Sequence, residues 1–364
     1  MNDKEIQKKS YDQESTNSTW TFCPICGAKL PQVQNVKFCV KCGTDIDFIK
    51  KHKQLPSRQT INPYIISTVQ PQYHPSFIDY GPAKISDESI LNTKDRKLWS
   101  TLTSIGLPLG AFIALEILLF VIVFIIIFFT NNINILFDLI YNPYFTILIS
   151  TMELIFIIFP ALHAGTYLKN PTIKNRLTLL GFTTKNYDRR RIFKEILIGL
   201  GFAVIGYIVV ISVSVLIEII LEFGFGIEIV TDDTNLEDSI IPPDILSLIL
   251  FCVVMILVIG TSEEILFRGF MQKGLVRNLG NTWGLLITAF IFSIIHLLGI
   301  FLVTEPPLTI FISFIISFIP YFAISLILGW LYYWRDENLI ANMICHGVYN
   351  TITIVIAYIF TVVF

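Results

Sequence analysis

Charged residues are scarce in this sequence. Lys and Arg together number 26 and Asp and Glu 28 among 364 residues, so 15% of the chain is charged while 54% is hydrophobic. A soluble globular protein carries a larger charged fraction, about a quarter of its residues. The composition therefore excludes an ordinary soluble protein and indicates a membrane protein. The net charge of -2 does not suggest a partner, and none of the nucleic-acid class is expected.

A cleavable signal peptide is also missing. The N-terminal segment has no basic stretch followed by a short apolar core, and residues 1–22 are polar with almost no aliphatic side chains. Such a segment cannot bury enough apolar area to order itself, which predicts a disordered tail. The first apolar span is then expected to be the targeting signal, with the polar N-terminus in the cytosol.

Cysteine is not distributed as a disulfide framework requires, because four of the six lie in one cluster, CPICGAKLPQVQNVKFCVKCG. Two CxxC pairs, twelve residues apart, are formed by Cys23, Cys26, Cys39 and Cys42. At this spacing the four thiolates can surround one tetrahedral zinc ion and leave it no open coordination position. Residues 23–46 are therefore predicted to form a zinc ribbon with structural zinc, suited to docking a protein partner or to regulation. A redox pair would not explain why CxxC occurs twice.

Long apolar runs are confined to the rest of the chain. Residues 47–98 contain five prolines among polar residues and predict a flexible linker. Seven apolar runs follow, near 105–129, 144–168, 192–221, 245–270, 283–303, 308–334 and 338–364. Each exceeds the roughly 20 residues that a helix needs to cross a bilayer. The predicted fold class is an all-α polytopic membrane protein, a bundle of about seven transmembrane helices in residues 99–364, preceded by the small zinc ribbon.

Positive charge is absent from alternate loops. Lys and Arg precede the first span, crowd the segment 169–194, and follow the fourth and sixth spans, whereas the intervening loops contain none and the segment 222–244 is acidic. Lys and Arg accumulate on the cytosolic side of short loops. The pattern predicts a multi-pass protein of the cell membrane with the N-terminus and ribbon in the cytosol and the C-terminus outside.

Ionisable residues inside the apolar runs are few, and one stretch, TSEEILFRGF, holds three of them. Such side chains cost roughly 2.5 to 3.5 kcal/mol each at membrane depth, so they tend to mark function. Glu264 and Arg268 are spaced i,i+4 and can form an ion pair on one helical face. Glu263 points about 100° away from Glu264 and has no partner on its own helix.

Two later spans carry a polar residue pair at the same spacing. Phe292 lies four residues before His296 in AFIFSIIHLLG, and His346 lies four before Asn350 in NMICHGVYN. Taken singly, a glutamate near a span end can snorkel to the interface, and a histidine in a bundle can serve packing. Together, one glutamate, two histidines and an asparagine can form a water-activating site with an oxyanion hole.

The stretches EEILFR (263–268), FSIIH (292–296) and HGVYN (346–350) resemble the EExxxR, FxxxH and HxxxN motifs of the CPBP family of intramembrane endopeptidases. This family includes the Ras-converting CAAX proteases and bacterial bacteriocin-processing or immunity (Abi) proteins. The similarity covers about residues 245–355, in the family's motif order. It does not extend to the zinc ribbon.

The resemblance implies a role for each motif residue. Glu263 would be the general base that polarises the attacking water, and His296 would hold that water. His346 and Asn350 would donate to the oxygen of the tetrahedral intermediate. Glu264 and Arg268 would form a supporting pair. Two versions stay open, a glutamate-type protease without a catalytic metal, which we favour, and a metalloprotease in which Glu263, His296 and His346 bind a metal.

Motifs of other hydrolases are missing, since the chain contains no HExxH, GxGD or GxSxG. The favoured function is hydrolysis of a peptide bond in a membrane-bound or lipidated substrate, such as a prenylated CaaX tail. The alternative is a non-catalytic immunity or scaffold protein that uses the ribbon to bind a partner. A transporter would predict internal repeats, and the sequence has none. Glu116, Glu153 and Glu218 lie in apolar runs without a partnered spacing and are assigned packing or cavity roles.

Overall fold

The chain is described here by a computed structural model, and it divides into two units, Met1–Ser76 and Phe77–Phe364. The described residues are 23, 39, 46, 49, 90–91, 98–140, 142–185, 187–227, 242–302 and 306–363. In the first unit, Cys23 and Cys39 are both buried. The predicted tail, the ligands Cys26 and Cys42 and most of the linker 47–98 lie outside the described residues, so the zinc ribbon stays a prediction.

The second unit is helical, which confirms the predicted fold class. Seven helical stretches in its described part are long and apolar enough to cross a membrane: Thr101–Thr130, Pro143–Gly165, Arg189–Gly224, Ile245–Leu279, Asn281–Ile300, Pro307–Trp334 and Ile340–Thr361. The described residues form no β-strand, only an isolated bridge between Leu91 and Leu168. The predicted spans agree closely except the fourth, which continues to Leu279 instead of ending near residue 270.

Short polar side chains fix where four of the apolar helices begin. They are Ser100 before α4 (Thr101–Thr130), Asn142 before α6 (Pro143–Ser150), Asp188 before α9 (Arg189–Ile219) and Asp244 before α11 (Ile245–Val254). Each accepts a hydrogen bond from a backbone N–H that has no partner in the first helical turn. At Asp244, bonds from the backbone and the hydroxyl of Ser247 hold the pKa of the carboxyl below its usual range.

The second and fourth spans are not uniform α-helices. The second changes from α6 to the 3₁₀ turn η3 (Thr151–Leu154) and then to α7 (Ile155–Gly165). The fourth runs through α11, the π-helical η5 (Met255–Ile259), α12 (Gly260–Glu264), the π-helical η6 (Ile265–Gln272) and α13 (Lys273–Leu279). Such irregular turns inside helices are frequent at functional sites. Here the 3₁₀ turn η3 packs against η5 and α12.

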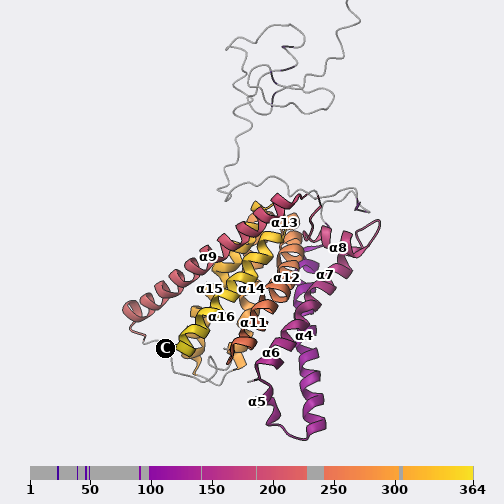
Figure 1. Ribbon diagram of the computed structural model, residues 1–364. Helices are drawn as coiled ribbons and strands as arrows, with labels where there is room; N and C mark the ends of the chain where they lie inside the picture. Colours follow the sequence, from indigo (N-terminus) through magenta and orange to yellow (C-terminus); the bar gives the residue numbers. More distant parts are fainter. Residues whose placement is uncertain are drawn as a thin grey trace, which may run out of the picture. The chain divides into compact units, whose positions relative to one another are not determined.

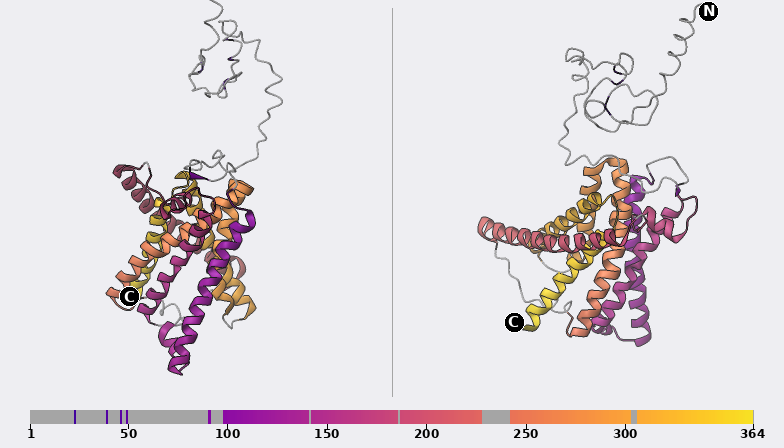
Figure 2. Two further views of the ribbon diagram at one scale, coloured as in Figure 1. Left: turned by 90° about the vertical axis from the view of Figure 1, so that its right-hand side faces the viewer. Right: turned by 45° about the horizontal axis from the view of Figure 1, so that its top comes forward.

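The fourth span lies at the centre of the bundle. The last three long helices are α14 (Asn281–His296), α15 (Pro307–Trp334) and α16 (Ile340–Val363). The segment from α12 to η6 contacts all three of them, and α4 and α7 pack against η6 from the other direction. The long helix α9 lies beside α15 and α16 (Figures 1 and 2). Side chains on α12 and η6 are therefore surrounded by other helices.

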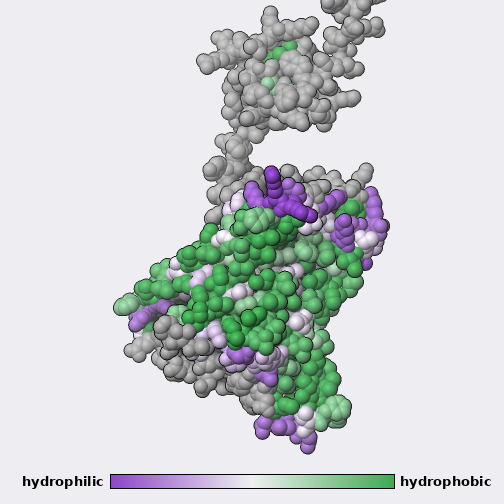
Figure 3. Space-filling model, viewed as in Figure 1, coloured by the Kyte–Doolittle hydropathy of each residue, from purple (hydrophilic) through white to green (hydrophobic). Residues whose placement is uncertain are grey.

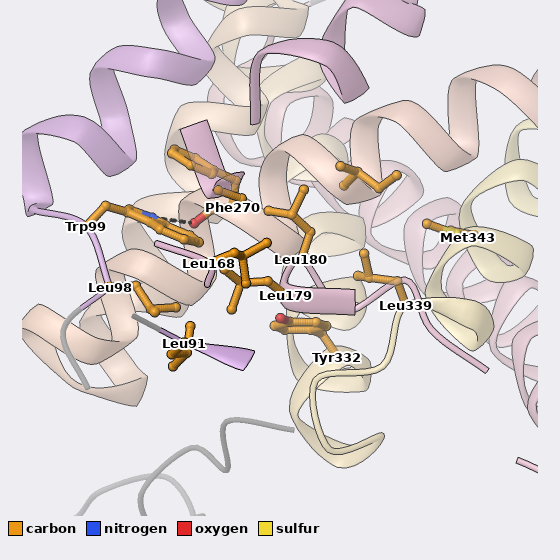
Figure 4. Packing of buried hydrophobic residues seen from close by; sticks show 12 residues of the cluster. Leu91, Leu98, Trp99, Leu168, Leu179, Leu180, Phe270, Tyr332, Leu339 and Met343 are labelled. Carbon is orange, nitrogen blue, oxygen red and sulfur yellow. Dashed lines mark hydrogen bonds between the residues drawn. The ribbon is translucent and has the colours of Figure 1, made fainter. Parts of the chain in front are cut away.

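A cluster of buried apolar side chains packs around η6. At its centre, the indole N–H of Trp99 donates to the carbonyl of Phe270 at 3.2 Å, and the two rings stack at 4.4 Å (Figure 4). Leu168, Leu180, Leu339 and other buried residues pack around this pair. The contact joins the start of α4 to the fourth span and holds η6 in place.

The outer surface of the helices is apolar. Phe120 and Phe128 on α4 are each about 70% exposed, at 71% and 70%, and α16 exposes Phe360 at 64%. Figure 3 shows hydrophobic residues over the sides of the helices and hydrophilic residues gathered at their ends. Exposed side chains of this kind are stable in lipid and not in water. Together with the seven spans, this surface identifies a multi-pass membrane protein.

Candidate active site

The EEILFR stretch lies inside the bundle and not at its surface. Glu264 and Arg268 are fully buried, and Glu263 is 7% exposed. Glu263 and Glu264 end α12, and Arg268 lies in the π-helical turn η6 that follows. Since the helix continues to Leu279, these side chains do not reach the interface by snorkelling. Their charges need partners within the protein.

Two glycines bring the fourth span and α16 into backbone contact. A Cβ atom on Gly347 would lie 2.5 Å from the Cα of Ile256, and one on Gly260 would lie 2.7 Å from the backbone nitrogen of Gly347. No side chain fits at either position without moving a helix. Small residues at a crossing allow helix backbones to approach closely in membranes. The crossing places His346, one residue before Gly347, directly against the glutamates of α12.

Glu264 is the hub of a buried hydrogen-bond network. Its Oε1 accepts from Nη1 of Arg268 at 2.7 Å and lies 2.8 Å from Nδ1 of His346. Its Oε2 accepts from the amide of Asn342 at 3.3 Å, and the same amide donates to the carbonyl of Leu328 at 2.6 Å. A buried carboxylate is tolerated when its charge is paired and its oxygens are hydrogen-bonded. Glu264 meets both conditions.

Arg268 extends the network to two further helices. Its Nη2 donates to the hydroxyl of Ser325 on α15 at 2.8 Å. Its guanidinium lies over the ring of Phe292 on α14, 4.8 Å from the centroid, which adds a cation–π contact. The Glu264–Arg268 pair thus joins the fourth span to α14, α15 and α16.

Glu263 faces the two histidines and is not bonded to either. Its Oε2 lies 3.8 Å from Nε2 of His296 and 3.8 Å from Nε2 of His346. These distances exceed a hydrogen bond. The oxygen is buried and has no hydrogen-bond partner among the described residues. A buried acceptor of this kind needs a hydrogen-bond donor, which a water molecule or a substrate group can provide.

The other ring nitrogen of each histidine is already engaged. Nδ1 of His296 lies 2.8 Å from the carbonyl of Phe292, and Nδ1 of His346 lies 2.8 Å from the Glu264 carboxylate. Both partners are acceptors, so each Nδ1 is assigned the proton. The neutral rings then present the Nε2 lone pair toward Glu263. Three acceptors converge, and a water molecule can donate its two O–H groups to two of them at a time.

Aromatic rings fix the plane of His296. The imidazole lies between the ring of Phe292, at 4.2 Å between centroids, and the ring of Tyr321 on α15, at 4.8 Å. Phe292 also meets His346 edge-on at 5.9 Å. The rings restrict the imidazole to an orientation in which Nε2 points at Glu263.

The structure brings five of the six predicted catalytic residues into one cluster. They are Glu263, Glu264, Arg268, His296 and His346. Asn350 lies one helical turn beyond His346 on α16 and is half-buried. Its side chain forms no hydrogen bond within the described part of the chain. The roles of all six stay predictions.

Three neighbours of this cluster were not recognised in the sequence: Asn342, Ser325 and Tyr321. Asn342 precedes His346 by four residues, so the spacing that singled out His346 also pointed to it. Ser325 and Tyr321 have no such signal, because they lie on α15 within an apolar run. Only the rotation of α15 in the bundle directs them at the site.

The described residues do not contain a preformed metal site. No group of three or more His, Cys, Asp or Glu side chains in this part of the chain is arranged to hold an ion. Glu263, His296 and His346 approach one another without the geometry of a ligand set. The four-cysteine zinc site is untested, since two of its ligands lie outside the described residues.

Seven apolar spans around a buried cluster of glutamates and histidines define the class of this protein: a multi-pass membrane protein with a cluster of ionisable side chains in its interior. Residues 245–352 match the family model described as Type II CAAX prenyl endopeptidase Rce1-like. The match supports the CAAX protease family that the motifs predicted, and the matched residues contain all three motifs. No curated protein and no solved structure matches the chain.

Proposed function

We propose that the chain is an intramembrane endopeptidase that hydrolyses a peptide bond in a membrane-associated substrate, with a prenylated CaaX tail as the first substrate class to test. The observation that carries the proposal is the buried Oε2 of Glu263, which has no hydrogen-bond partner in the described part of the chain and lies 3.8 Å from Nε2 of both His296 and His346. The family match of residues 245–352 supports the same reaction class.

Glu263 is the general base of the proposed reaction. A water molecule beside Oε2 gives one proton to Glu263, and its oxygen attacks the carbonyl carbon of the scissile peptide bond. Glu263 then returns the proton to the leaving amine as the carbon–nitrogen bond breaks. His296 accepts a hydrogen bond from the same water through Nε2 and orients it. No covalent acyl-enzyme forms.

His346 and Asn350 are proposed to stabilise the oxyanion of the tetrahedral intermediate. Because Nδ1 of His346 donates to Glu264, the ring donates to a substrate oxygen only when Nε2 also carries a proton. Glu264 is the counter-charge for that imidazolium, as a buried aspartate is for the histidine of a Ser-His-Asp triad. The Asn350 amide, one turn further along α16, supplies the second donor.

Cleavage of a farnesylated CaaX reporter peptide by the purified full-length protein in detergent tests this proposal. We expect the wild type to cleave the reporter and Glu263→Gln to lower kcat by about 10²- to 10⁴-fold, the contribution of a general base. Glu116→Gln is the matched control, because Glu116 lies in an apolar span but is exposed on α4. No cleavage by the wild type would contradict the CaaX substrate and favour the non-catalytic immunity or scaffold alternative.

We favour a glutamate-type reaction without a catalytic metal over a metalloprotease reaction. A chelator added to the wild-type assay separates the two versions. Activity that survives the chelator agrees with the metal-free version. Activity that is lost while the predicted ribbon keeps its zinc would favour a metal at Glu263, His296 and His346.

The topology is part of the proposal. The basic segment 169–194 is assigned to the cytosolic side and the loop after α4 to the outside. Cysteines introduced at two exposed positions, Lys174→Cys and Asn132→Cys, test it in intact cells with a membrane-impermeant maleimide. Labelling is expected at residue 132 and not at 174. The reverse result would contradict the predicted orientation in the membrane and place the proposed ribbon outside the cytosol.

A further inference from the structure

The second span is interrupted at a single acidic residue. Glu153 lies in the 3₁₀ turn η3, between α6 and α7. This turn packs against η5 and α12, the segments that lead to and contain Glu263. A break in helical geometry therefore lies beside the proposed active site, on an element outside the residues of the family match.

Glu153 is half-buried, and its Oε2 atom is buried without a hydrogen-bond partner among the described residues. No Lys, Arg or His in this part of the chain forms an ion pair with it. The turn that carries Glu153 packs against α12, which carries Glu263. Glu153 and Glu263 thus each have a buried oxygen in need of a hydrogen bond, on two segments that are in contact.

The proposed reaction decides which carboxyl carries the negative charge. Glu263, 3.8 Å from Nε2 of both histidines, is the proposed general base, and a base must be ionised to accept a proton. No cation contacts Glu153 among the described residues. Two neighbouring carboxyl groups do not ionise together in a medium of low dielectric constant. The proposed general-base role of Glu263 therefore places the charge on Glu263 and the proton on Glu153.

We propose that Glu153 is a positioning residue of the site: its neutral carboxyl donates a hydrogen bond toward Glu263, directly or through one water, and holds Oε2 of Glu263 between the two histidines. This inference rests on the proposed peptidase function. It adds a residue of the second span to the site, whose proposed catalytic residues lie on the fourth, fifth and last spans. A protonated carboxyl is the only form of Glu153 that supplies a donor to a carboxylate.

Three full-length variants in detergent test this role through kcat and KM for the CaaX reporter and through the melting temperature. Glu153→Gln keeps a neutral donor and is expected to retain kcat within about threefold. Glu153→Leu keeps the volume and removes the donor, and kcat is expected to fall on the order of 100-fold with KM nearly unchanged, the effect of a misplaced reacting group. Glu116→Leu, on the exposed side of α4, controls for loss of a glutamate from an apolar span.

The melting temperature distinguishes positioning from packing. An apolar side chain at a buried site without a polar partner is neutral or stabilising. Glu153→Leu is therefore expected to melt at or above the wild-type temperature although its kcat is low. Wild-type kcat in Glu153→Leu, equal damage in Glu153→Gln, or a lower melting temperature with a parallel loss in kcat would each overturn the inference. If the wild type cleaves no reporter, the proposed function fails by itself, and the melting temperature of Glu153→Leu still decides whether the carboxyl serves packing.

Discussion

Nδ1 of His346 lies 2.8 Å from Oε1 of Glu264, so the last span and the fourth span meet through a buried charged hydrogen bond. The same oxygen accepts from Arg268 at 2.7 Å. One carboxylate thus orients a proposed catalytic imidazole and neutralises a buried guanidinium. The two tasks can be separated by experiment.

Glu264→Gln should damage both tasks. Without the carboxylate, the His346 ring loses its counter-charge, and the corresponding change in a Ser-His-Asp triad lowers kcat about 10⁴-fold. Arg268 is left as an unpaired buried charge, which costs roughly 3 to 5 kcal/mol of stability. Activity on the reporter and the melting temperature measure the two effects. In the double variant Glu264→Gln, Arg268→Met, stability should largely return while kcat stays low. Recovery of kcat in the double variant would contradict the role of Glu264 at His346.

Gly347→Ala should separate the two spans. The added Cβ would lie 2.5 Å from the Cα of Ile256, and backbone atoms on both sides cannot move aside as a side chain does. We expect a loss of about 1 to 3 kcal/mol in stability, as for overpacking, and at least a tenfold loss of kcat. Gly106→Ala is the matched control, since its Cβ would meet nothing within 4 Å. A Gly347→Ala protein with wild-type activity would show that the close crossing does not position His346.

Tyr321→Ala should lower kcat by about tenfold through the orientation of His296. The Tyr321 ring lies 4.8 Å from the imidazole, and such aromatic pairs contribute about 0.5 to 1.5 kcal/mol. Tyr321→Phe keeps the ring and should retain most of the activity. If Tyr321→Phe is as slow as Tyr321→Ala, the hydroxyl and not the ring contributes, and the stacking argument is wrong.

Stability should depend on Glu337 at acid pH. Burial alone would raise the pKa of Glu337, but ion pairs with Lys273 at 3.1 Å and Arg277 at 3.0 Å outweigh it and hold the pKa below its usual range. A lowered folded-state pKa stabilises the protein above the unfolded-state value, about 4.3, and this contribution is lost as the pH falls through the folded-state value. The melting temperature of the wild type should therefore drop below about pH 4. Glu337→Gln should melt lower at neutral pH and show a weaker drop, and Glu222→Gln, at an exposed position, should match the wild type.

Zinc in the predicted ribbon is open to direct measurement. One zinc ion per chain is expected in the purified protein, and Cys26→Ser, Cys42→Ser should lose it, because four thiolates form the predicted site. The reporter assay in detergent should be unaffected, since this zinc has no proposed part in the reaction. A protein without zinc, or a variant that keeps it, would contradict the ribbon.

Much of the membrane domain could be predicted because its signals are local. An apolar run long enough for a bilayer is readable from consecutive residues, and the seven spans appear where hydropathy indicated them. The pair Glu264 and Arg268 could be predicted for the same reason, since i,i+4 neighbours share a helical face in any surrounding. Hydropathy predicts an end of the fourth span near residue 270, whereas the helix continues to Leu279. The charged residues after 270 resemble a loop in sequence, which is why the predicted end is too early.

The sequence by itself determined the helices, the similarity of residues 245–352 to the Rce1-like family model and the polar residues of the three motifs. Only the tertiary structure decided which of these residues meet. The contacts of Glu264 with Asn342, of Arg268 with Ser325 and of η3 with α12 depend on helix rotation and on the crossing at Gly260 and Gly347. Rotation and crossing are set by packing between segments distant in the chain, which no local periodicity records. Glu153, for which the sequence predicts a packing or cavity role, lies on a turn that contacts the segment of Glu263 for this reason.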